Sequence, residues 1–481
     1  MTVRKKRLPF VVSGRRLDGK PGRTVTVSSP TGLELEMPRF DAELASEMIE
    51  ANRQSLADLP LQEILSFLNR AGKNWKSEEY VRRRFYVRQL QDILGYSDPA
   101  ANAEADRIAI LLTSHARMYD MIAAELGSRY IVDDWTAREE CWVRALPRGL
   151  VLHILPSNVP LSCAISIVRG IITKNVSVAK MGAGDLLTAV ALALTFTDLS
   201  TTHPVTRSMN AVYWEHDNPE GLRLLGAADA VCAWGAEEAI AHAQRHARID
   251  AAVTSFGPKE SFAIIDASMD PAAAAKGLAH DVAIYDQRAC FSIRRVYLTG
   301  PAEPFLELLR KEMDRHEELL PPSALTDDKS ASIQIARREE LFFGAGVHGS
   351  DALAWTIVVC PANEGYTDHP LSRILYVYPV ESLSEAYQYA HPGVQTVAAH
   401  PWHLLPEHRD EFAKRGVSRF VELGLVHLFR IGGTHDSINP LQGLVRLVST
   451  EAPGSVHGKG MVVNLDETAM LQAGTLKDLV L

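Results

Sequence analysis

The stretch Gly149-Leu150-Val151-Leu152-His153-Ile154-Leu155-Pro156-Ser157-Asn158-Val159-Pro160 decides the fold class of this chain. Its apolar run predicts a buried strand, and the two prolines around Asn158 predict a fixed turn where that strand ends. Further apolar runs lie at 176–179, 209–214, 230–234 and 252–255, with helix-like segments at 187–199 and 237–245 between them. Strands and helices that alternate in this way are typical of parallel β-α-β units, so we predict an α/β fold.

A second alternating block follows, and helices precede the first. Apolar runs at 261–265, 295–298, 356–359, 374–380 and 395–399 predict the strands of the second block. Residues from about 40 to 127 predict helices; from Asp106 to Ile122 the apolar spacing indicates one amphipathic helix that stops at Gly127. At 481 residues the chain is too long for one compact core, so we expect two domains.

Composition and charge exclude several classes of protein. Apolar residues make up 46% of the chain, and the net charge of −9 gives no reason to expect a nucleic-acid partner. We expect a cytoplasmic protein, because we find neither an apolar run of about 18 residues for a membrane span nor a secretion signal. The five cysteines are widely spaced, which indicates reduced thiols. His400, His403 and His408 lack the companion ligands of a metal site, so no metal is predicted.

Cys290 is the main candidate for chemistry, in the run Asp286-Gln287-Arg288-Ala289-Cys290-Phe291-Ser292. A lone cysteine is more often a small, inert core residue. Here a predicted helix at 272–285 and a polar run precede it, which favours a thiol at a helix-to-loop junction, and the nearby Arg288 would favour the thiolate. We therefore favour a nucleophile that carries an acyl group as an enzyme-bound thioester.

Asn158 is the second candidate, directly after the first predicted strand. Its side chain either closes an Asx turn or donates its NH₂ group to an oxyanion, and the two roles are compatible. Ligands of open α/β sheets bind at the carboxyl ends of the strands, where Asn158 is expected.

Four motifs resemble the aldehyde dehydrogenase superfamily in order and approximate spacing: Pro156-Ser157-Asn158-Val159-Pro160, Val176-Ser177-Val178-Ala179-Lys180, Ser255-Phe256-Gly257-Pro258-Lys259 and Asp286-Gln287-Arg288-Ala289-Cys290. The resemblance runs from about Leu150 to Gly433. More narrowly, the runs around Asn158, Trp234, Gly257 and Cys290 resemble the acyl-CoA reductases of the bacterial bioluminescence type. This resemblance implies helices and a Rossmann-type dinucleotide-binding domain over 1–252, an α/β catalytic domain over 253–420, and a return segment with an oligomerisation arm over 421–481.

The resemblance also implies roles for individual residues. Cys290 resembles the superfamily nucleophile, and Asn158 resembles the side-chain oxyanion donor that acts beside the Cys290 backbone N–H. Lys180 resembles the lysine that meets the adenosine ribose or its phosphate. Trp234 and Gly235 correspond to the turn that opens a helix near the pyrophosphate, although an ordinary strand-to-helix turn fits them too, and Gly257 is expected to bind the cofactor.

Two departures from the superfamily pattern bear on the reaction. Ser255 stands where aldehyde-oxidising members have the glutamate that activates the hydrolytic water, so an acyl-enzyme would be protected from hydrolysis. Ala183 stands where NAD-preferring members have an acid that grips the ribose. The pattern therefore favours NADPH, with NADH possible, because Asp185 is close by in sequence.

These resemblances imply NADPH-dependent reduction of a fatty acyl-CoA, or of another fatty acyl thioester, to a fatty aldehyde. Alternatives are a CoA-acylating aldehyde dehydrogenase or an acyl-phosphate reductase of the same fold, and a non-catalytic scaffold that holds an acyl group. The expected partners are acyl-CoA or an acyl-carrying protein, such as an acyl-protein synthetase or acyltransferase, and further copies of the chain in a homo-oligomer.

Overall fold

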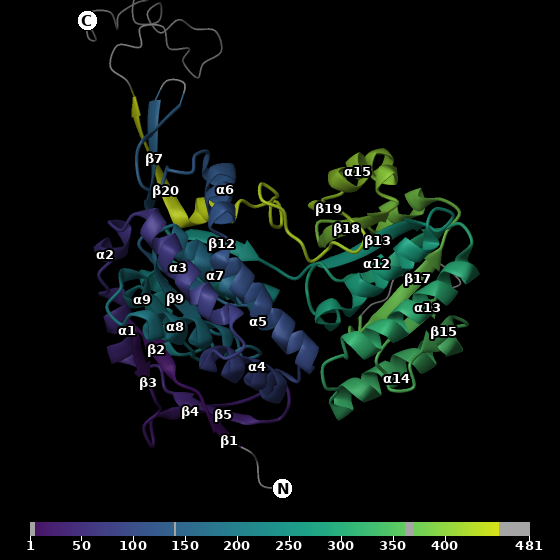
Figure 1. Cartoon of the computed structure of the whole chain (residues 1–481), viewed down its shortest axis with the longest axis horizontal. Coiled ribbons are helices and arrows are strands. Elements are labelled where there is room, and N and C mark those ends of the chain that lie inside the picture. The colour runs from purple at the N-terminus through teal and green to yellow at the C-terminus, as the bar shows by residue number, and fades with distance from the viewer. Residues whose placement is uncertain (1–4, 139–140, 361–368, 452–481) are drawn as a thin grey trace, which may run out of the picture.

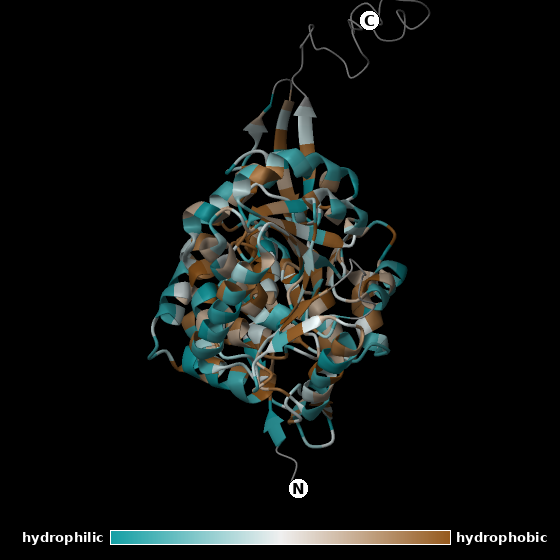
Figure 2. Cartoon of the chain, turned by 90° about the vertical axis from the view of Figure 1, so that its right-hand side faces the viewer, coloured by the Kyte–Doolittle hydropathy of each residue, from teal (hydrophilic) through white to brown (hydrophobic). Residues whose placement is uncertain are grey.

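The computed structural model describes residues 5–138, 141–360 and 369–451 of the chain. Two mixed α/β lobes lie side by side, each built around its own sheet (Figure 1). Figure 2 shows apolar residues concentrated on the strands and polar residues on the outer helix surfaces. This distribution is the one expected when each sheet is covered by amphipathic helices.

The first lobe contains a sheet whose strands run in the order β12-β11-β8-β9-β10-β2-β3. The neighbours from β12 to β10 are parallel, and β2 and β3 are antiparallel additions at the edge. The strands of this sheet are β2 (Phe10–Val12), β3 (Arg15–Leu17), β8 (Leu150–Ile154), β9 (Val176–Lys180), β10 (Met209–Val212), β11 (Ala230–Trp234) and β12 (Ala252–Phe256). The chain moves outward from β8 to β10 and then returns to the other side of β8, which makes β8 and β11 the point where the strand order reverses.

Helices surround this sheet, and a small sheet of β1 (Lys5–Arg7), β5 (Glu34–Pro38) and β4 (Thr24–Ser28) lies at its base. The helices of the first lobe are α1 (Ala42–Ile49), α2 (Gln54–Ala57), α3 (Leu61–Lys76), α4 (Val81–Leu94), α5 (Asp98–Thr113), α6 (His115–Leu126), α7 (Pro160–Ile172), α8 (Thr188–Leu199), α9 (Pro204–Arg207), α10 (Pro219–Ala227) and α11 (Glu237–His246). One continuous apolar core joins helices and sheet.

The expected strands and helices of this lobe are confirmed, but the single helix expected from Asp106 to Gly127 is wrong. The chain breaks between α5 and α6 at Ser114, which has φ −87° and ψ 57°. The Ser114 hydroxyl donates to the carbonyl of Ile110 at 2.6 Å, and the Thr113 hydroxyl donates to that of Ala109 at 2.9 Å. Such side-chain bonds compete with the helical ladder. The expected stop is confirmed, since Gly127 caps α6 in a left-handed conformation.

The second lobe repeats the plan with the strand order β15-β16-β17-β14-β13-β18-β19, parallel except for β15. Its strands are β13 (Glu260–Asp266), β14 (Ile293–Thr299), β15 (Gly346–Gly349), β16 (Thr356–Val359), β17 (Ile374–Pro379), β18 (Val394–His400) and β19 (Arg419–Glu422). Its helices are α12 (Pro271–Ala283), η1 (Ile284–Gln287), α13 (Ala302–Leu319), α14 (Asp327–Phe342), η2 (Leu383–Tyr389), η3 (Trp402–Leu404) and α15 (Leu405–Lys414). Separate apolar cores fill the two faces of this sheet.

The last described segment returns to the first lobe. After β19 the chain forms η4 (Pro440–Leu444), which packs near α6 and α7, and then β20 (Val445–Glu451). Strand β20 pairs with β7 (Cys141–Pro147), which also pairs with β6 (Thr136–Ala137), and together they form an arm that projects from the body (Figure 1). Residues 452–481 of the expected arm lie outside the described residues. Within the described ranges, we find no helix with the length and apolar character needed to cross a membrane.

Candidate active site

Cys290 lies in a short loop between η1 and β14, as the sequence predicted. Tyr285, Asp286 and Gln287, which lie in η1 before Arg288 and Ala289, all have a left-handed backbone, with φ values of 57°, 49° and 61°. None of them is glycine, so this conformation is strained and persists only where neighbouring contacts enforce it. Strain of this kind is common where a side chain must be held in one position for chemistry.

Side-chain bonds enforce the strained loop. The amide of Gln287 donates to the carbonyls of Ile293 and Ile374, both at 2.8 Å. The carboxylate of Asp286 is paired with the guanidinium of Arg373 at 2.8 Å. Gln287 and Arg373 are buried, and Asp286 is largely so, which limits competition from water. The backbone that precedes Cys290 is therefore fixed from two sides.

The electrostatic surroundings of Cys290 keep its thiol neutral. Burial raises the pKa of Cys290 to about 11, and the negative charge of Asp436 also raises it. A hydrogen bond with the Gln395 side chain and the positive charge of Arg419 act in the opposite direction. Gln395 in turn donates to the carboxylate of Asp436 at 2.6 Å. Sequence reasoning missed Gln395, Arg419 and Asp436, because no motif marks them and the fold brings them to Cys290 from β18, β19 and the 435–438 turn.

The expected influence of Arg288 on the thiolate is corrected by the structure. Its guanidinium donates to the carbonyl of Tyr285 at 3.2 Å and to the hydroxyl of Ser323 at 2.9 Å, and it lies over the ring of Tyr96. The cation that lowers the pKa of Cys290 is Arg419. Arg288 contributes its backbone to the site.

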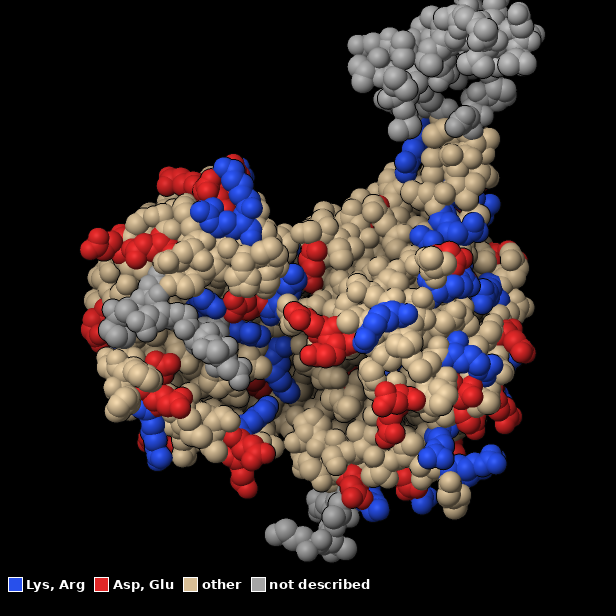
Figure 3. All heavy atoms as spheres, turned by 180° about the vertical axis from the view of Figure 1, so that it is seen from behind, with Lys and Arg blue, Asp and Glu red and all other residues tan. Residues whose placement is uncertain are grey.

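Asn158 reaches the Cys290 loop from the other lobe. It follows β8, and its side-chain amide donates to the carbonyl of Arg288 at 2.6 Å, two residues before Cys290. An amide NH₂ group carries two hydrogens, so this bond leaves the second N–H for another acceptor. The structure thus brings the Asn158 side chain against the loop that carries Cys290. A hollow separates parts of the two lobes on the face shown in Figure 3.

The other predicted site residues lie at one edge of the first sheet. Lys180 ends β9, Trp234 ends β11, and Gly257 follows β12, while Asn158 follows β8. These strands are parallel neighbours, so their carboxyl ends meet at one edge, and β8 and β11 mark the point where strand order reverses. This is the position at which open α/β sheets bind ligands.

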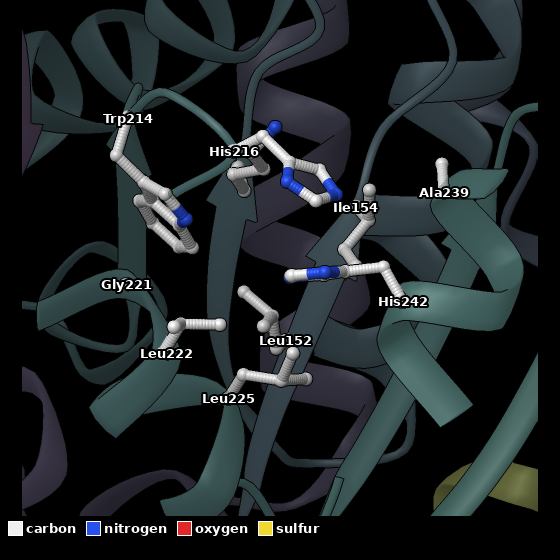
Figure 4. Close-up of a pocket in the computed structure, with 10 residues that line it drawn as sticks. Leu152, Ile154, Trp214, His216, Gly221, Leu222, Leu225, Ala239 and His242 are labelled. Carbon is white, nitrogen blue, oxygen red and sulfur yellow. The ribbon is translucent and has the colours of Figure 1, made fainter. Parts of the chain in front are cut away.

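Lys180 lines a small pocket at this edge, between the sheet and helices α10 and α11. Figure 4 shows its wall and floor, which are formed by Leu152, Ile154, Trp214, His216, Gly221, Leu222, Leu225, Ala239 and His242. The ammonium of Lys180 lies about 6 Å from the rings of Tyr213 (5.9 Å) and Trp214 (6.0 Å), and burial lowers its pKa. Apolar, aromatic and cationic groups of this kind suit a flat heterocycle beside an anionic sugar, which is the chemistry of a dinucleotide end.

Trp234 and Gly235 lie at the turn between β11 and α11. The Trp234 ring stacks on Phe256 with centroids 3.9 Å apart, and its N–H donates to Ser166 at 3.2 Å. Gly235 has φ 154°, which only glycine adopts readily, and opens the turn into α11. The first turn of α11 carries Glu237 and Glu238, and two carboxylates make this helix end less favourable for a phosphate.

Asp185, which lies close to the departure from the superfamily pattern at Ala183, and Ser255, the other departure, have defined structural settings. The Asp185 carboxylate is buried and accepts from the backbone of Leu187 and from the backbone and hydroxyl of Thr188, so it caps α8. Ser255 lies in β12, and within the described residues its buried hydroxyl has no hydrogen-bond partner.

Among the residues that the structure describes, we find no group of three or more His, Cys, Asp or Glu side chains suited to a metal ion.

Comparison with known proteins shows the family of the chain. The family model described as acyl-CoA reductase (LuxC) matches residues 56–447. The long-chain acyl-protein thioester reductase of Aliivibrio fischeri is 43% identical over 425 residues, which cover 88% of each chain, and that of Vibrio harveyi is 39% identical over 97% of this chain and 98% of its own. The structure of an NAD-dependent aldehyde dehydrogenase from Sinorhizobium meliloti superposes with a TM-score of 0.72 at 16% identity, covering 93% of this chain and 95% of its own. The protein is therefore an enzyme of the acyl-CoA reductase (LuxC) family, built on the aldehyde dehydrogenase fold.

Proposed function

We propose that the protein reduces a fatty acyl thioester to a fatty aldehyde with NADPH, through an acyl group carried on Cys290. The observation that carries this proposal is the hydrogen bond from Asn158 to the Arg288 carbonyl, which holds an amide donor beside the nucleophile loop. The names of the relatives, long-chain acyl-protein thioester reductase, support the same reaction class.

In the first half-reaction the Cys290 thiolate attacks the thioester carbonyl. The second N–H of Asn158 and the backbone N–H of Cys290 stabilise the oxyanion of the tetrahedral intermediate. The carbon–sulfur bond to the donor then breaks, and the donor thiolate takes up the proton that Cys290 released. Because the pKa of Cys290 is raised to about 11, only a small fraction of the enzyme carries the thiolate at neutral pH.

In the second half-reaction the acyl-enzyme must meet a hydride before it meets water. NADPH supplies that hydride when it is bound. The acyl-enzyme is protected from hydrolysis because position 255 holds a serine, whose hydroxyl does not act as the general base that a glutamate would provide. The collapse of the resulting hemithioacetal returns the electron pair of the carbon–sulfur bond to Cys290 and releases the aldehyde.

The residues around the pocket at the edge of the first sheet fit the adenosine end of the cofactor. Lys180 supplies positive charge for a ribose phosphate, and Trp214 and the apolar floor suit the base. Ala183 carries no charge, and the Asp185 carboxylate is occupied at the start of α8. A 2′-phosphate therefore meets no free carboxylate from these two positions, which favours NADPH over NADH.

The acyl donor is acyl-CoA or an acyl-carrying protein such as an acyl-protein synthetase or acyltransferase. We also propose that the protein forms a homo-oligomer through the arm of β7 and β20. Two large apolar side chains on this arm, Trp142 and Leu447, are 49% and 50% exposed, and a second chain packed against the arm would cover them.

The test is to supply acyl-CoA, acyl phosphate, and aldehyde with CoA in parallel, and to follow NADPH consumption or formation. The proposal predicts aldehyde from acyl-CoA with NADPH, and none from the Cys290→Ala variant. Faster turnover of acyl phosphate than of acyl-CoA would support an acyl-phosphate reductase. Activity only in the direction of thioester formation, from aldehyde and CoA, would support a CoA-acylating dehydrogenase. Acyl transfer to Cys290 without hydride transfer would support the scaffold.

A further inference from the structure

Glu104 is a buried carboxylate that connects the two halves of the candidate active site. It lies on α5 in the first lobe, far in sequence from every motif described above, and its side chain is 0% exposed. One carboxylate oxygen accepts from the backbone N–H of Leu161 at 2.5 Å. The other accepts from the hydroxyl of Tyr285 at 2.8 Å and from the guanidinium of Arg107 at 3.1 Å.

The bond to Leu161 fixes the turn that carries Asn158. Helix α7 begins at Pro160, so the N–H of Leu161 has no partner within the helix. A carboxylate at a helix N-terminus satisfies such a group and is favoured by the helix dipole. Leu161 lies three residues after Asn158, so Glu104 holds the end of the turn from which the Asn158 amide extends.

The bond to Tyr285 fixes the loop that carries Cys290. Tyr285 is the first of the three left-handed residues before Cys290, and its ring also lies under the guanidinium of Arg107, 5.2 Å from the ring centroid. Gln287 and Asp286 are held by contacts within the second lobe. Tyr285 is held from the first lobe, by Glu104 and Arg107.

Such a carboxylate is costly to bury, so stability alone is a weak reason for its presence. Removing an ionised group from water costs several kcal/mol, and buried ion pairs are often no better than apolar residues for stability. The cost is partly offset here by Arg107, the Tyr285 hydroxyl and the Leu161 N–H. These contacts instead fix the geometry of the site, because the Glu104 carboxylate binds both the turn that carries Asn158 and the segment that precedes Cys290.

We propose that Glu104 is a positioning residue that sets the Asn158 amide against Cys290 by binding Leu161 and Tyr285 at once. This inference rests on the proposed function, in which Asn158 stabilises an oxyanion formed at Cys290. Glu104 itself touches neither the thiol nor the acyl group in this account. Its effect on acyl transfer passes through Asn158.

The experiment uses variants that remove single contacts in the full-length protein. Tyr285→Phe deletes only the hydroxyl that binds Glu104, and Glu104→Gln keeps the size of the side chain but removes its charge. Tyr80→Phe is the matched control, because the Tyr80 hydroxyl makes a similar bond to the Asp198 carboxylate at 3.0 Å. Thermal unfolding of each variant measures any general loss of stability.

Acylation of Cys290 is followed by the burst of nitrophenolate from p-nitrophenyl acetate, an acyl donor that needs no cofactor or CoA site. Alkylation by iodoacetamide, which forms no oxyanion, reports the reactivity of the thiol alone. We expect Tyr285→Phe and Glu104→Gln to slow the burst about tenfold, the effect of one charged hydrogen bond, with alkylation changed less than about twofold. Tyr80→Phe should change neither rate.

The decisive comparison repeats Tyr285→Phe in an Asn158→Ala background. If Glu104 and Tyr285 act through Asn158, the added substitution has no further effect on the burst. Equal losses in both backgrounds, or parallel losses of burst and alkylation, would overturn the positioning role. A normal burst with no reaction of acyl-CoA would contradict the proposed substrate while leaving this inference standing, and no burst from the wild-type protein would overturn both.

Discussion

The reactivity of Cys290 should increase steeply with pH across the whole neutral range. With a pKa of about 11, the thiolate makes up roughly 0.03% of the enzyme at pH 7.5, compared with about 3% for a thiol at the ordinary value of 9.0. Alkylation of Cys290 should therefore be about tenfold slower than that of an ordinary thiol at this pH, because the greater nucleophilicity of a more basic thiolate offsets part of the smaller thiolate fraction. Each added pH unit up to 9 should raise the rate about tenfold, without a plateau.

The assay is alkylation by iodoacetamide between pH 6.5 and 9, with the modified Cys290 peptide quantified by mass spectrometry. Measuring this peptide separates Cys290 from the partly exposed Cys141 and Cys360. The Asp436→Asn variant is the informative companion, because the Asp436 charge raises the pKa of Cys290. Its removal should increase alkylation at pH 7.5.

Two results would contradict the raised pKa of Cys290 or its proposed cause. A plateau below pH 8 in the wild-type protein would mean that the thiol is activated before substrate arrives. Unchanged alkylation in Asp436→Asn would mean that the Asp436 carboxylate does not act on Cys290. The plateau would mean that the resting enzyme holds a stable thiolate, whereas unchanged alkylation in Asp436→Asn would leave burial as the cause of the raised pKa.

Three further predictions concern the oxyanion, the acyl-enzyme and stability. Asn158→Ala should slow acylation of Cys290 by roughly 10²–10³-fold, about 2.7–4 kcal/mol, in rapid-quench measurements with acyl-CoA, and an unchanged rate would remove Asn158 from the mechanism. Ser255→Glu should increase free acid relative to aldehyde, measured by chromatography of the products, and no gain in acid would mean that position 255 does not face the thioester. Burial raises the pKa of Asp281 from 3.8 to about 7, although the Gly424 N–H binds its carboxylate at 2.6 Å. The folded state thus keeps a proton that the unfolded state loses above pH 3.8, so the free energy of unfolding falls as pH rises from about 4 to 7. The Tm of Asp281→Asn, relative to that of the wild-type protein, should therefore be higher at pH 8 than at pH 5. An equal Tm difference at both pH values would contradict this.

The sequence predicted strands β8 to β12 of the first lobe and β13, β14, β16, β17 and β18 of the second, because each is a short apolar run bounded by turn residues. It did not predict β15 and β19, which form the two edges of the second sheet. It also predicted that Asn158 and Cys290 carry the chemistry, and the structure brings their loops within one hydrogen bond. Periodicity failed at Ser114, where the apolar pattern continues although hydroxyl bonds break the helix. It also gave no sign of the strands before residue 40, which are short and lie at sheet edges or in a small separate sheet.

The rest of the site could not be predicted, because it depends on contacts between distant segments. Glu104 looks like an ordinary helix residue in the sequence, and only the packing of α5 against α7 and η1 makes it the link between the lobes. Gln395 and Asp436 reach Cys290 through the pairing of β18 and the tight turn at 435–438. No local sequence pattern indicates contacts between segments that are distant in the chain.

The most direct test of acyl transfer through Cys290 is to mix the purified protein with radiolabelled acyl-CoAs of different chain length, quantify the acyl label on Cys290, and then add NADPH while aldehyde is trapped. We expect labelling before NADPH is added, and loss of the label afterwards with aldehyde formation and stoichiometric NADPH consumption. Both should be absent from Cys290→Ala. Aldehyde formation by Cys290→Ala, or the absence of label and aldehyde from the wild-type protein with every acyl-CoA, would contradict acyl transfer through Cys290.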